Sequence, residues 1–214
     1  MKLSAKNFRL ALENKELKLA FVGMSNIGKS FTAKRIAKSH KFKLVEVDKL
    51  IWESLGFDSM EDLADWQGQP YEEDYAEREA ELIRLEAIAT QKAMKPTKGN
   101  SLLDTTGSVI YVDPAIRRAL KEKYYVVHIK AEPSDLERLK WEYYDNPKPL
   151  IWGRQFKAKP DLSDSENILE CFPKLLMSRA KEYAAMADAT LTSKFVLDPD
   201  VTEEEIMLAI KPAR

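Results

Sequence analysis

The sequence predicts a three-layer α/β/α fold with a five-stranded parallel sheet. Short apolar runs alternate along the chain with longer segments whose apolar residues recur at helical spacing, as in a sheet covered by helices on both faces. The first apolar run also leads directly into a glycine-bearing turn. The length of 214 residues fits one domain over residues 1–214 better than two full domains.

The start of the chain predicts a helix, a strand, a loop and a second helix. Residues 1–18 lack the apolar centre of a signal peptide, so we expect a short helix there. Residues 17–22 form an apolar run that Gly23 ends, which indicates the first strand. Apolar residues at helical spacing then predict a helix over residues 29–39.

The next segment predicts a second strand followed by helices. The strand is FKLVEV at residues 42–47, which ends beside Asp48, and a short helix follows it. Ser59 begins a further short helix. A long acidic helix is expected over residues 71–94, and we interpret its stretch 71–86 as a solvated face.

The second half of the chain continues the alternation. The polar, proline-punctuated segment around residues 146–165 is expected to be a mobile, lid-like insertion in the domain. The other expected elements are strands at residues 101–104, 124–129 and 195–197, helices over residues 114–122 and 173–187, a helix that opens at Ser134, and a last helix capped at Thr202.

The composition excludes several partners. A net charge of -1 leaves no strong field for nucleic acid or a membrane surface. No apolar run reaches the roughly 18 residues of a membrane span, and one cysteine, Cys171, permits no internal disulfide. We therefore expect a cytoplasmic protein, monomeric or weakly homo-oligomeric, that acts on a small molecule.

Residues 23–30 read GMSNIGKS and match the Walker A pattern G-x-x-x-x-G-K-[ST] of phosphate-binding loops (P-loops). Glycine lets backbone N–H groups approach phosphate oxygens, and a helix N-terminus adds its positive end. Asn26 tolerates the left-handed conformation better than most residues. Lys29 would reach the β- and γ-phosphates, and the Ser30 hydroxyl would hold Mg²⁺. The residues expected to bind the nucleotide are Gly23, Ser25, Asn26, Ile27, Gly28, Lys29, Ser30 and Phe31.

The same loop is also similar to that of small GTPases. Its N-I-G-K-S and the D-T-T-G at residues 104–107 match the loop and the D-x-x-G motif of those proteins. Guanine recognition there uses N-K-x-D or T-K-x-D after a later strand, and this sequence has no such string. The nearest stretch, TKGN at residues 97–100, lacks the aspartate and precedes D-T-T-G. A GTPase is therefore the less favoured alternative.

Further motifs resemble the shikimate kinase family and its small-metabolite kinase relatives. The loop and helix at residues 28–37 are similar to those of the family, and Glu46 and Asp48 lie 17 and 19 residues after Lys29, where the family has an acidic pair. Other similarities follow in order within residues 17–210. YAERE at residues 75–79 is similar to F-R-x-x-E, and KPLI at residues 148–151 is similar to the R-P-L-L of the lid. RAKEY at residues 179–183, followed by Ala187-Asp188, is similar to R-x-x-x-Y…A-D.

The resemblance implies an ATP-dependent kinase that uses Mg²⁺ and phosphorylates a hydroxyl of a small metabolite. Asp48 would orient the acceptor hydroxyl and take its proton. Glu46 would hold a water on Mg²⁺ alongside Ser30, and Lys29 would neutralise charge on the transferred phosphoryl group.

The resemblance also implies contacts to the acceptor and the lid. Arg179 would contact an anionic group of the acceptor, and Gly107 would lie against the acceptor. Lys148 and Arg154 would belong to the lid that covers the nucleotide.

Several positions depart from the family pattern. The loop after the third strand keeps one glycine, Gly107, of the family's three, and Ala76 replaces an acceptor-binding arginine. Lys148 replaces the lid arginine and cannot make a bidentate contact. Asp104, by contrast, adds a carboxylate placed to bind Mg²⁺ through water. Two alternatives therefore stay open, namely an acceptor other than shikimate and a nucleotide-binding relative with weak or no catalysis.

Overall fold

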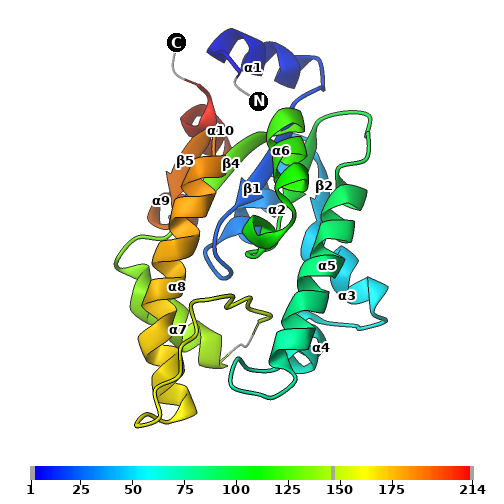
Figure 1. The fold of residues 1–214 in the computed structure, drawn as a ribbon. Helices are drawn as coiled ribbons and strands as arrows, with labels where there is room; N and C mark the ends of the chain where they lie inside the picture. The colour runs from blue at the N-terminus through cyan, green and yellow to red at the C-terminus, as the bar shows by residue number, and fades with distance from the viewer. Residues whose placement is uncertain (1–2, 146–147, 213–214) are drawn as a thin grey trace.

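A computed structural model describes residues 3–145 and 148–212 of the chain (Figure 1). In this part, five strands form one sheet in the order β2-β3-β1-β4-β5, and each neighbouring pair is parallel. The strands are β1 Lys18–Val22, β2 Lys43–Glu46, β3 Ser101–Asp104, β4 Tyr125–Lys130 and β5 Ala189–Thr192. The structure confirms the predicted fold class.

Helices cover both faces of the sheet, as Figure 1 shows. The helices are α1 Ala5–Glu13, α2 Lys29–Ser39, α3 Val47–Ser54, α4 Met60–Gln67, α5 Tyr75–Ala93, α6 Pro114–Lys123, α7 Asp135–Asp145, α8 Asp164–Met186, α9 Ser193–Leu197 and α10 Glu203–Ile210, with a 3₁₀ turn η1 Val109–Tyr111. None of the helices in the described ranges is long and apolar enough to cross a lipid bilayer.

The strands separate two apolar cores because successive side chains point to opposite faces. Leu19 and Phe21 of β1 pack with α1, α2 and α10, whereas Ala20 and Val22 pack with α5, α6 and the end of α8. Both faces of β1 are fully buried apart from its first residue, which explains why its sequence is a continuous apolar run.

The long helix α8 begins earlier than the sequence predicts. A helix was expected from residue 173, but α8 starts at Asp164 and contains Pro173 in its interior. Ser163 and Glu166 form a reciprocal capping box that fixes the true start. Proline is typical of the first turn of a helix, whereas Pro173 lies inside α8, where it removes one backbone hydrogen bond of a helix that packing maintains.

The predicted position of the last strand is wrong. The strand was expected at residues 195–197, but β5 is Ala189–Thr192, and residues 195–197 lie in α9. The Thr192 hydroxyl accepts a hydrogen bond of 3.2 Å from the Phe195 backbone N–H and thereby caps α9. β5 lies at the edge of the sheet and has one buried residue, so the apolar run that follows it resembles a strand more than β5 does.

Candidate active site

The phosphate loop has the backbone that its sequence predicts. Gly23, Asn26 and Gly28 all have positive φ angles, of 148°, 58° and 95°. Asn26 therefore adopts the left-handed conformation expected of it, in place of a glycine. A side chain on Gly28 would also collide with Leu197 of α9, because a Cβ there would lie 2.8 Å from Leu197 Cδ2. The positive φ angle favours glycine at this position, and the Leu197 side chain would have to shift to admit a larger residue.

Helix α2 begins at Lys29 directly after the loop. Its N-cap, Gly28, has no side chain to accept hydrogen bonds from the first-turn N–H groups. These donors, with the positive end of the helix dipole, make the start of α2 a site for an anion. The ammonium of Lys29 donates a 2.9 Å hydrogen bond to the Met24 carbonyl, which folds the lysine over the loop. Burial lowers the pKa of Lys29, while the carboxylates of Asp104 and Asp48 act against this shift.

Asp104 lies at the end of β3, between the ends of β1 and β2. Its Cα is in register with Phe21 on one side and Glu46 on the other. The carboxyl is buried, and its Oδ1 has no hydrogen-bond partner in the described structure. Burial raises the pKa of Asp104, and the charge of Lys29 and a hydrogen bond from the Ser30 hydroxyl oppose that rise. Ser30 and Asp104 thus face each other at the start of α2.

This pair fits an Mg²⁺ ion that also binds phosphate oxygens. In the described ranges, no group of three or more His, Cys, Asp or Glu side chains could hold a metal ion. Mg²⁺ in kinase sites needs only one or two protein ligands, with phosphates and water completing its shell. The free Oδ1 of Asp104 suits that role. Glu46 pairs instead with Lys34 at 2.9 Å, and its predicted part in holding a metal-bound water stays a prediction.

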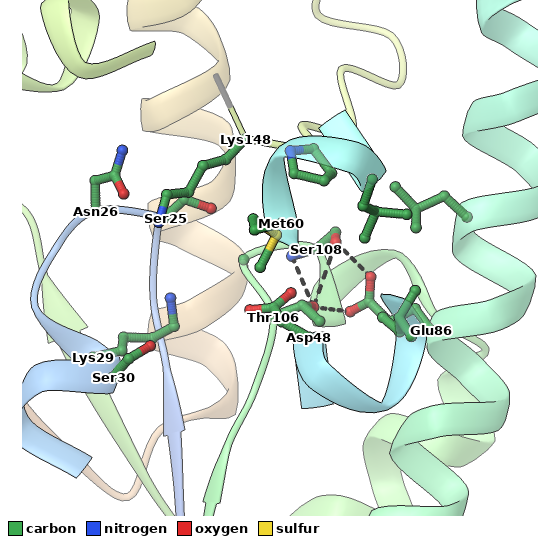
Figure 2. Close-up of a pocket in the computed structure, with 15 residues that line it drawn as sticks. Ser25, Asn26, Lys29, Ser30, Asp48, Met60, Glu86, Thr106, Ser108 and Lys148 are labelled. Atoms are coloured by element: carbon green, nitrogen blue, oxygen red, sulfur yellow. Dashed lines mark hydrogen bonds between the residues drawn. The ribbon is translucent and has the colours of Figure 1, made fainter. Parts of the chain in front are cut away.

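Asp48 lies in the first turn of α3, directly after β2, rather than at the end of the strand. Its side chain lines a cavity of about 80 Å³ together with Lys29 and Ser30 (Figure 2). Burial raises the pKa of Asp48 to about 6, and the nearby Lys29 ammonium limits this rise. A carboxylate with such a pKa next to a phosphate loop can accept a proton from a hydroxyl group.

The cavity also contains a carboxyl group that is not among the predicted site residues. Glu86 of α5 was placed on a solvated face, but it is completely buried, so that interpretation is wrong. Its two carboxyl oxygens accept hydrogen bonds from the hydroxyls of Thr106 and Ser108. Burial raises the pKa of Glu86 to about 7, and the two hydroxyls limit the rise.

The helical phase of α5 contains the signal that would have located Glu86. Leu82, Ala89 and Ala93 of α5 are buried, and Glu86 occurs with them at the spacing of one helix face. The side chains of α5 that line the cavity are Leu82 and Glu86, and neither Tyr75 nor Glu79 is among the lining residues. The stretch 75–79, which resembles F-R-x-x-E, therefore lies away from the cavity.

Tyr75 and Glu79 hold the segment that follows Lys148. The Tyr75 hydroxyl donates to the Leu150 carbonyl at 2.6 Å, and Glu79 accepts hydrogen bonds from the N–H groups of Trp152 and Gly153 at 2.6 and 2.9 Å. Residues 150–152 are buried. The predicted lid thus has an anchored part, and its first two residues, 146 and 147, lie outside the described residues. Its motion stays a prediction.

The two predicted lid cations differ in position. Lys148 lines the cavity beside Asp48 and also a neighbouring hollow of about 420 Å³ next to the phosphate loop. Arg154 is exposed and lines neither of them, so its nucleotide contact stays a prediction. The hollow is lined by Asn26, Gly28, Lys29, Ser30, Phe31, Arg138, Glu142, Lys148 and Leu197. Arg138 was not predicted, and it donates a 2.9 Å hydrogen bond to the Asn26 carbonyl.

Arg179 is buried beside the cavity without lining it. Its Nη1 donates to the Gly107 carbonyl at 3.0 Å, and its Nη2 donates to the Ile151 carbonyl at 2.6 Å. Its guanidinium carbon lies 5.3 Å from the centre of the Tyr111 ring. Gly107 itself lines the cavity. Its buried Nε has no hydrogen-bond partner in the described structure, and the predicted contact of Arg179 with an anionic acceptor group stays a prediction.

One comparison with known proteins shows the family of this chain. The family model for shikimate kinase matches residues 25–195. A search of curated proteins gives no match.

Three solved shikimate kinases have similar structures. The enzyme from Acinetobacter baumannii, in complex with shikimate, is 18% identical with a TM-score of 0.64, over 92% of this chain and 93% of that chain. The enzyme from Bacteroides thetaiotaomicron is 16% identical with a TM-score of 0.62, over 90% and 94%. The one from Aquifex aeolicus is 15% identical with a TM-score of 0.52, over 91% and 93%. At these identities the structures show a shared fold.

Proposed function

The chain belongs to the shikimate kinase family, whose model covers residues 25–195, and we propose that it transfers the γ-phosphoryl group of ATP to an acceptor held beside Asp48. The family assignment makes the protein an ATP-dependent kinase that acts on a hydroxyl of a small metabolite. The observation that supports these residue roles is the juxtaposition of Lys29, Ser30 and Asp48 around one cavity (Figure 2).

The nucleotide is proposed to bind across the start of α2. The free N–H groups after Gly28 and the ammonium of Lys29 would surround its phosphates, and the adjoining hollow with Phe31 and Arg138 would take the rest of it. Ser30 and Asp104 would hold Mg²⁺. When bound, the ion would neutralise phosphate charge.

The acceptor is proposed to place its hydroxyl between Asp48 and the γ-phosphate. The acceptor oxygen would form the new bond to phosphorus, its proton would go to the Asp48 carboxylate, and the bond from phosphorus to the bridging oxygen of ADP would break. Lys29 would stabilise the charge that spreads over the phosphoryl oxygens, since its ammonium lies at the same cavity. The products are ADP and a phosphate monoester, with one proton released.

Turnover of ATP with a panel of small hydroxyl compounds tests this function. We expect Mg²⁺-dependent formation of ADP with at least one acceptor, and a loss of about 100-fold or more in Lys29→Ala. Lys38→Ala, which removes an exposed lysine from the same helix, is the matched control and should retain the wild-type rate. ATP binding without transfer across a broad panel would contradict the proposal. A preference for GTP over ATP would instead favour the GTPase alternative.

A further inference from the structure

Lys148 lines both the cavity beside Asp48 and the neighbouring nucleotide hollow. The other described residues that line both are Asn26, Lys29 and Ser30, which belong to the phosphate loop and the start of α2. In Figure 2 the side chain of Lys148 lies above those of Lys29 and Ser30. Lys148 is exposed and forms no ion pair with any residue that the structure describes. A second cation, besides Lys29, therefore lies where the phosphoryl group is proposed to pass from the nucleotide to the acceptor.

Two buried side chains hold the main chain two residues after Lys148. Gln67 of α4 binds both polar groups of Leu150, since its Oε1 accepts from the Leu150 N–H at 2.8 Å and its Nε2 donates to the carbonyl at 3.0 Å. The Tyr75 hydroxyl of α5 donates to the same carbonyl at 2.6 Å. Gln67, Tyr75 and Leu150 are only 1%, 6% and 5% exposed, so water does not compete for these bonds.

The carboxylate of Glu79 holds the residues that follow. Its Oε1 accepts hydrogen bonds from the N–H groups of Trp152 at 2.6 Å and Gly153 at 2.9 Å. Gly153 has a φ angle of 56°, and a residue in this left-handed conformation lets successive N–H groups converge on one anion. The Trp152 ring packs against the rings of Tyr143 and Phe172. The main chain is therefore fixed by side chains from residue 150 to residue 153.

Pro149 transmits this fixation to Lys148. The ring of a proline fixes its own φ angle at about -65°, and the residue before a proline is confined mainly to extended conformations. Leu150 is held at both its N–H and its carbonyl, so few free torsions remain between this anchor and the Cα of Lys148. The position of Lys148 therefore depends on side chains of α4 and α5 that line neither the cavity nor the nucleotide hollow.

We propose that Gln67, Tyr75 and Glu79 are positioning residues that place the Lys148 ammonium against the phosphates of the nucleotide. They act through Lys148 and contact neither the nucleotide nor the acceptor. The inference rests on the proposed function, because it takes the hollow beside Lys29 as the nucleotide site. Lysine has a point charge on a flexible stem, so a fixed main chain is needed to limit the movement of its ammonium. Phosphoryl transfer depends on charges that are in place before the reaction starts.

A double-mutant cycle between Tyr75 and Lys148 tests the proposal. Calorimetry measures the affinity of the full chain for a non-hydrolysable ATP analogue with Mg²⁺. We expect Lys148→Ala to weaken binding about tenfold and Tyr75→Phe to weaken it about fivefold. The double variant should bind as Lys148→Ala does, because Tyr75 acts through Lys148. A Tyr75→Phe effect that is equally large without Lys148, or no effect of Tyr75→Phe, would overturn the proposal.

A control variant separates positioning from a general loss of stability. The Tyr125 hydroxyl also donates to a backbone carbonyl in a buried place, that of Ile210 at 3.0 Å. Tyr125 is the first residue of β4 and pairs with Leu19, so it lies at the opposite end of the strands from the phosphate loop. Tyr125→Phe should lose a similar amount of stability and keep the wild-type affinity for the ATP analogue. An equal loss of affinity in Tyr125→Phe and Tyr75→Phe would refute the positioning role.

Glu79→Gln gives a second cycle if Tyr75→Phe folds poorly. It keeps the size of the side chain and removes the charge that strengthens the bonds to Trp152 and Gly153. We expect binding of the ATP analogue to weaken about threefold in the presence of Lys148 and not at all in the Lys148→Ala background. Glu77→Gln, at an exposed position of the same helix, should bind as the wild type does. Equal losses in the two backgrounds would contradict the proposal.

Turnover of ATP separates this proposal from the kinase function. If the cycles show the expected coupling to Lys148 but no acceptor is phosphorylated, the inference stands and the proposed function fails. If an acceptor is phosphorylated and neither cycle shows coupling, the proposed function stands and the inference is wrong.

Discussion

Arg179 donates a 3.0 Å hydrogen bond to the carbonyl oxygen of Gly107, which also accepts one from the Tyr183 hydroxyl. The same arginine binds the Ile151 carbonyl, so one buried guanidinium joins the loop after β3 to the segment after Lys148. Gly107 in turn approaches the phosphate loop so closely that a Cβ on it would lie 3.0 Å from Ser25 Oγ. Helix α8 thus fixes two walls of the active site relative to each other.

Replacement of Arg179 should destabilise this arrangement. In Arg179→Lys, one ammonium replaces a planar group that reaches two carbonyls, so at least one buried hydrogen bond is lost. We expect the free energy of unfolding to fall by about 2 to 3 kcal/mol in urea denaturation. Arg84→Lys, at an exposed pair with Glu81, is the control and should leave the free energy of unfolding as in the wild type. Equal stability of Arg179→Lys and the wild type would contradict a structural role for the guanidinium.

Alanine substitutions at Gly28 and Gly99 should separate the effect of backbone strain from the effect of a steric clash. Gly28 and Gly99 have φ angles of 95° and 87°, but a Cβ on Gly99 would meet nothing within 4 Å. Both alanine variants should lose about 1 to 2 kcal/mol through left-handed strain. Gly28→Ala should in addition weaken ATP binding strongly in calorimetry. The added methyl group would displace Leu197, which lines the hollow proposed to take part of the nucleotide. Similar ATP affinities in the two variants would argue against this packing.

Gln67 should control the exposure of the segment after Lys148. Its Oε1 accepts from the Leu150 N–H at 2.8 Å, and its Nε2 donates to the Leu150 carbonyl at 3.0 Å. In Gln67→Ala, hydrogen exchange of the Leu150 amide should accelerate about tenfold. Gln91→Ala, at an exposed position of α5, is the control and should leave that exchange rate unchanged. Unaltered exchange in Gln67→Ala would show that other contacts hold the segment.

Glu86 should make the stability of the protein depend on pH. The pKa of Glu86 is raised to about 7 from an ordinary value of 4.5, through burial and, to a smaller degree, the nearby Asp48. Below pH 4.5 the group is protonated in both states, whereas between pH 4.5 and 7 it ionises only on unfolding. Its contribution to stability therefore falls as pH rises through this window, by up to about 3 kcal/mol in total.

Urea denaturation of Glu86→Gln at pH 5 and pH 8 measures this contribution. The stability of Glu86→Gln relative to the wild type should rise between the two pH values, because the variant has no carboxyl group to ionise. Glu77→Gln, at an exposed site, should show no such change. A relative stability of Glu86→Gln that is independent of pH would mean that Glu86 titrates normally in the folded protein.

Local chemical signals made much of the fold predictable. The apolar run of β1, the glycines of the phosphate loop and the cap at Thr202 each determine local structure through nearby residues. The errors occurred where tertiary contacts override local preference. Pro173 lies inside a packed helix, and β5 gains its stability from pairing with β4 rather than from its own apolar content.

The active site likewise contains residues that the sequence identifies and residues whose positions depend on tertiary contacts. A contiguous motif specifies Lys29 and Ser30, whereas Asp48, which lines the same cavity, was indicated by the resemblance to the family's acidic pair, and its role stays a prediction. The helical phase of α5 indicates that Glu86 is buried, but its partners, Thr106 and Ser108, are 20 and 22 residues away along the chain, so the sequence does not show what it binds. The contacts of Arg179 could not be predicted either, because its hydrogen-bond partners are backbone carbonyls, which every residue has.

Asp48 is proposed to act as the base when the γ-phosphoryl group of ATP passes to a hydroxyl of the acceptor. Phosphorus-31 NMR of the full chain with Mg²⁺, ATP and an acceptor panel follows the γ-phosphorus directly. We expect a phosphate monoester to appear in amounts equal to ADP, about 100-fold or more slowly in Asp48→Asn, and at the wild-type rate in the exposed control Asp65→Asn. Inorganic phosphate as the sole product with every acceptor, or an unchanged rate in Asp48→Asn, would contradict the claim.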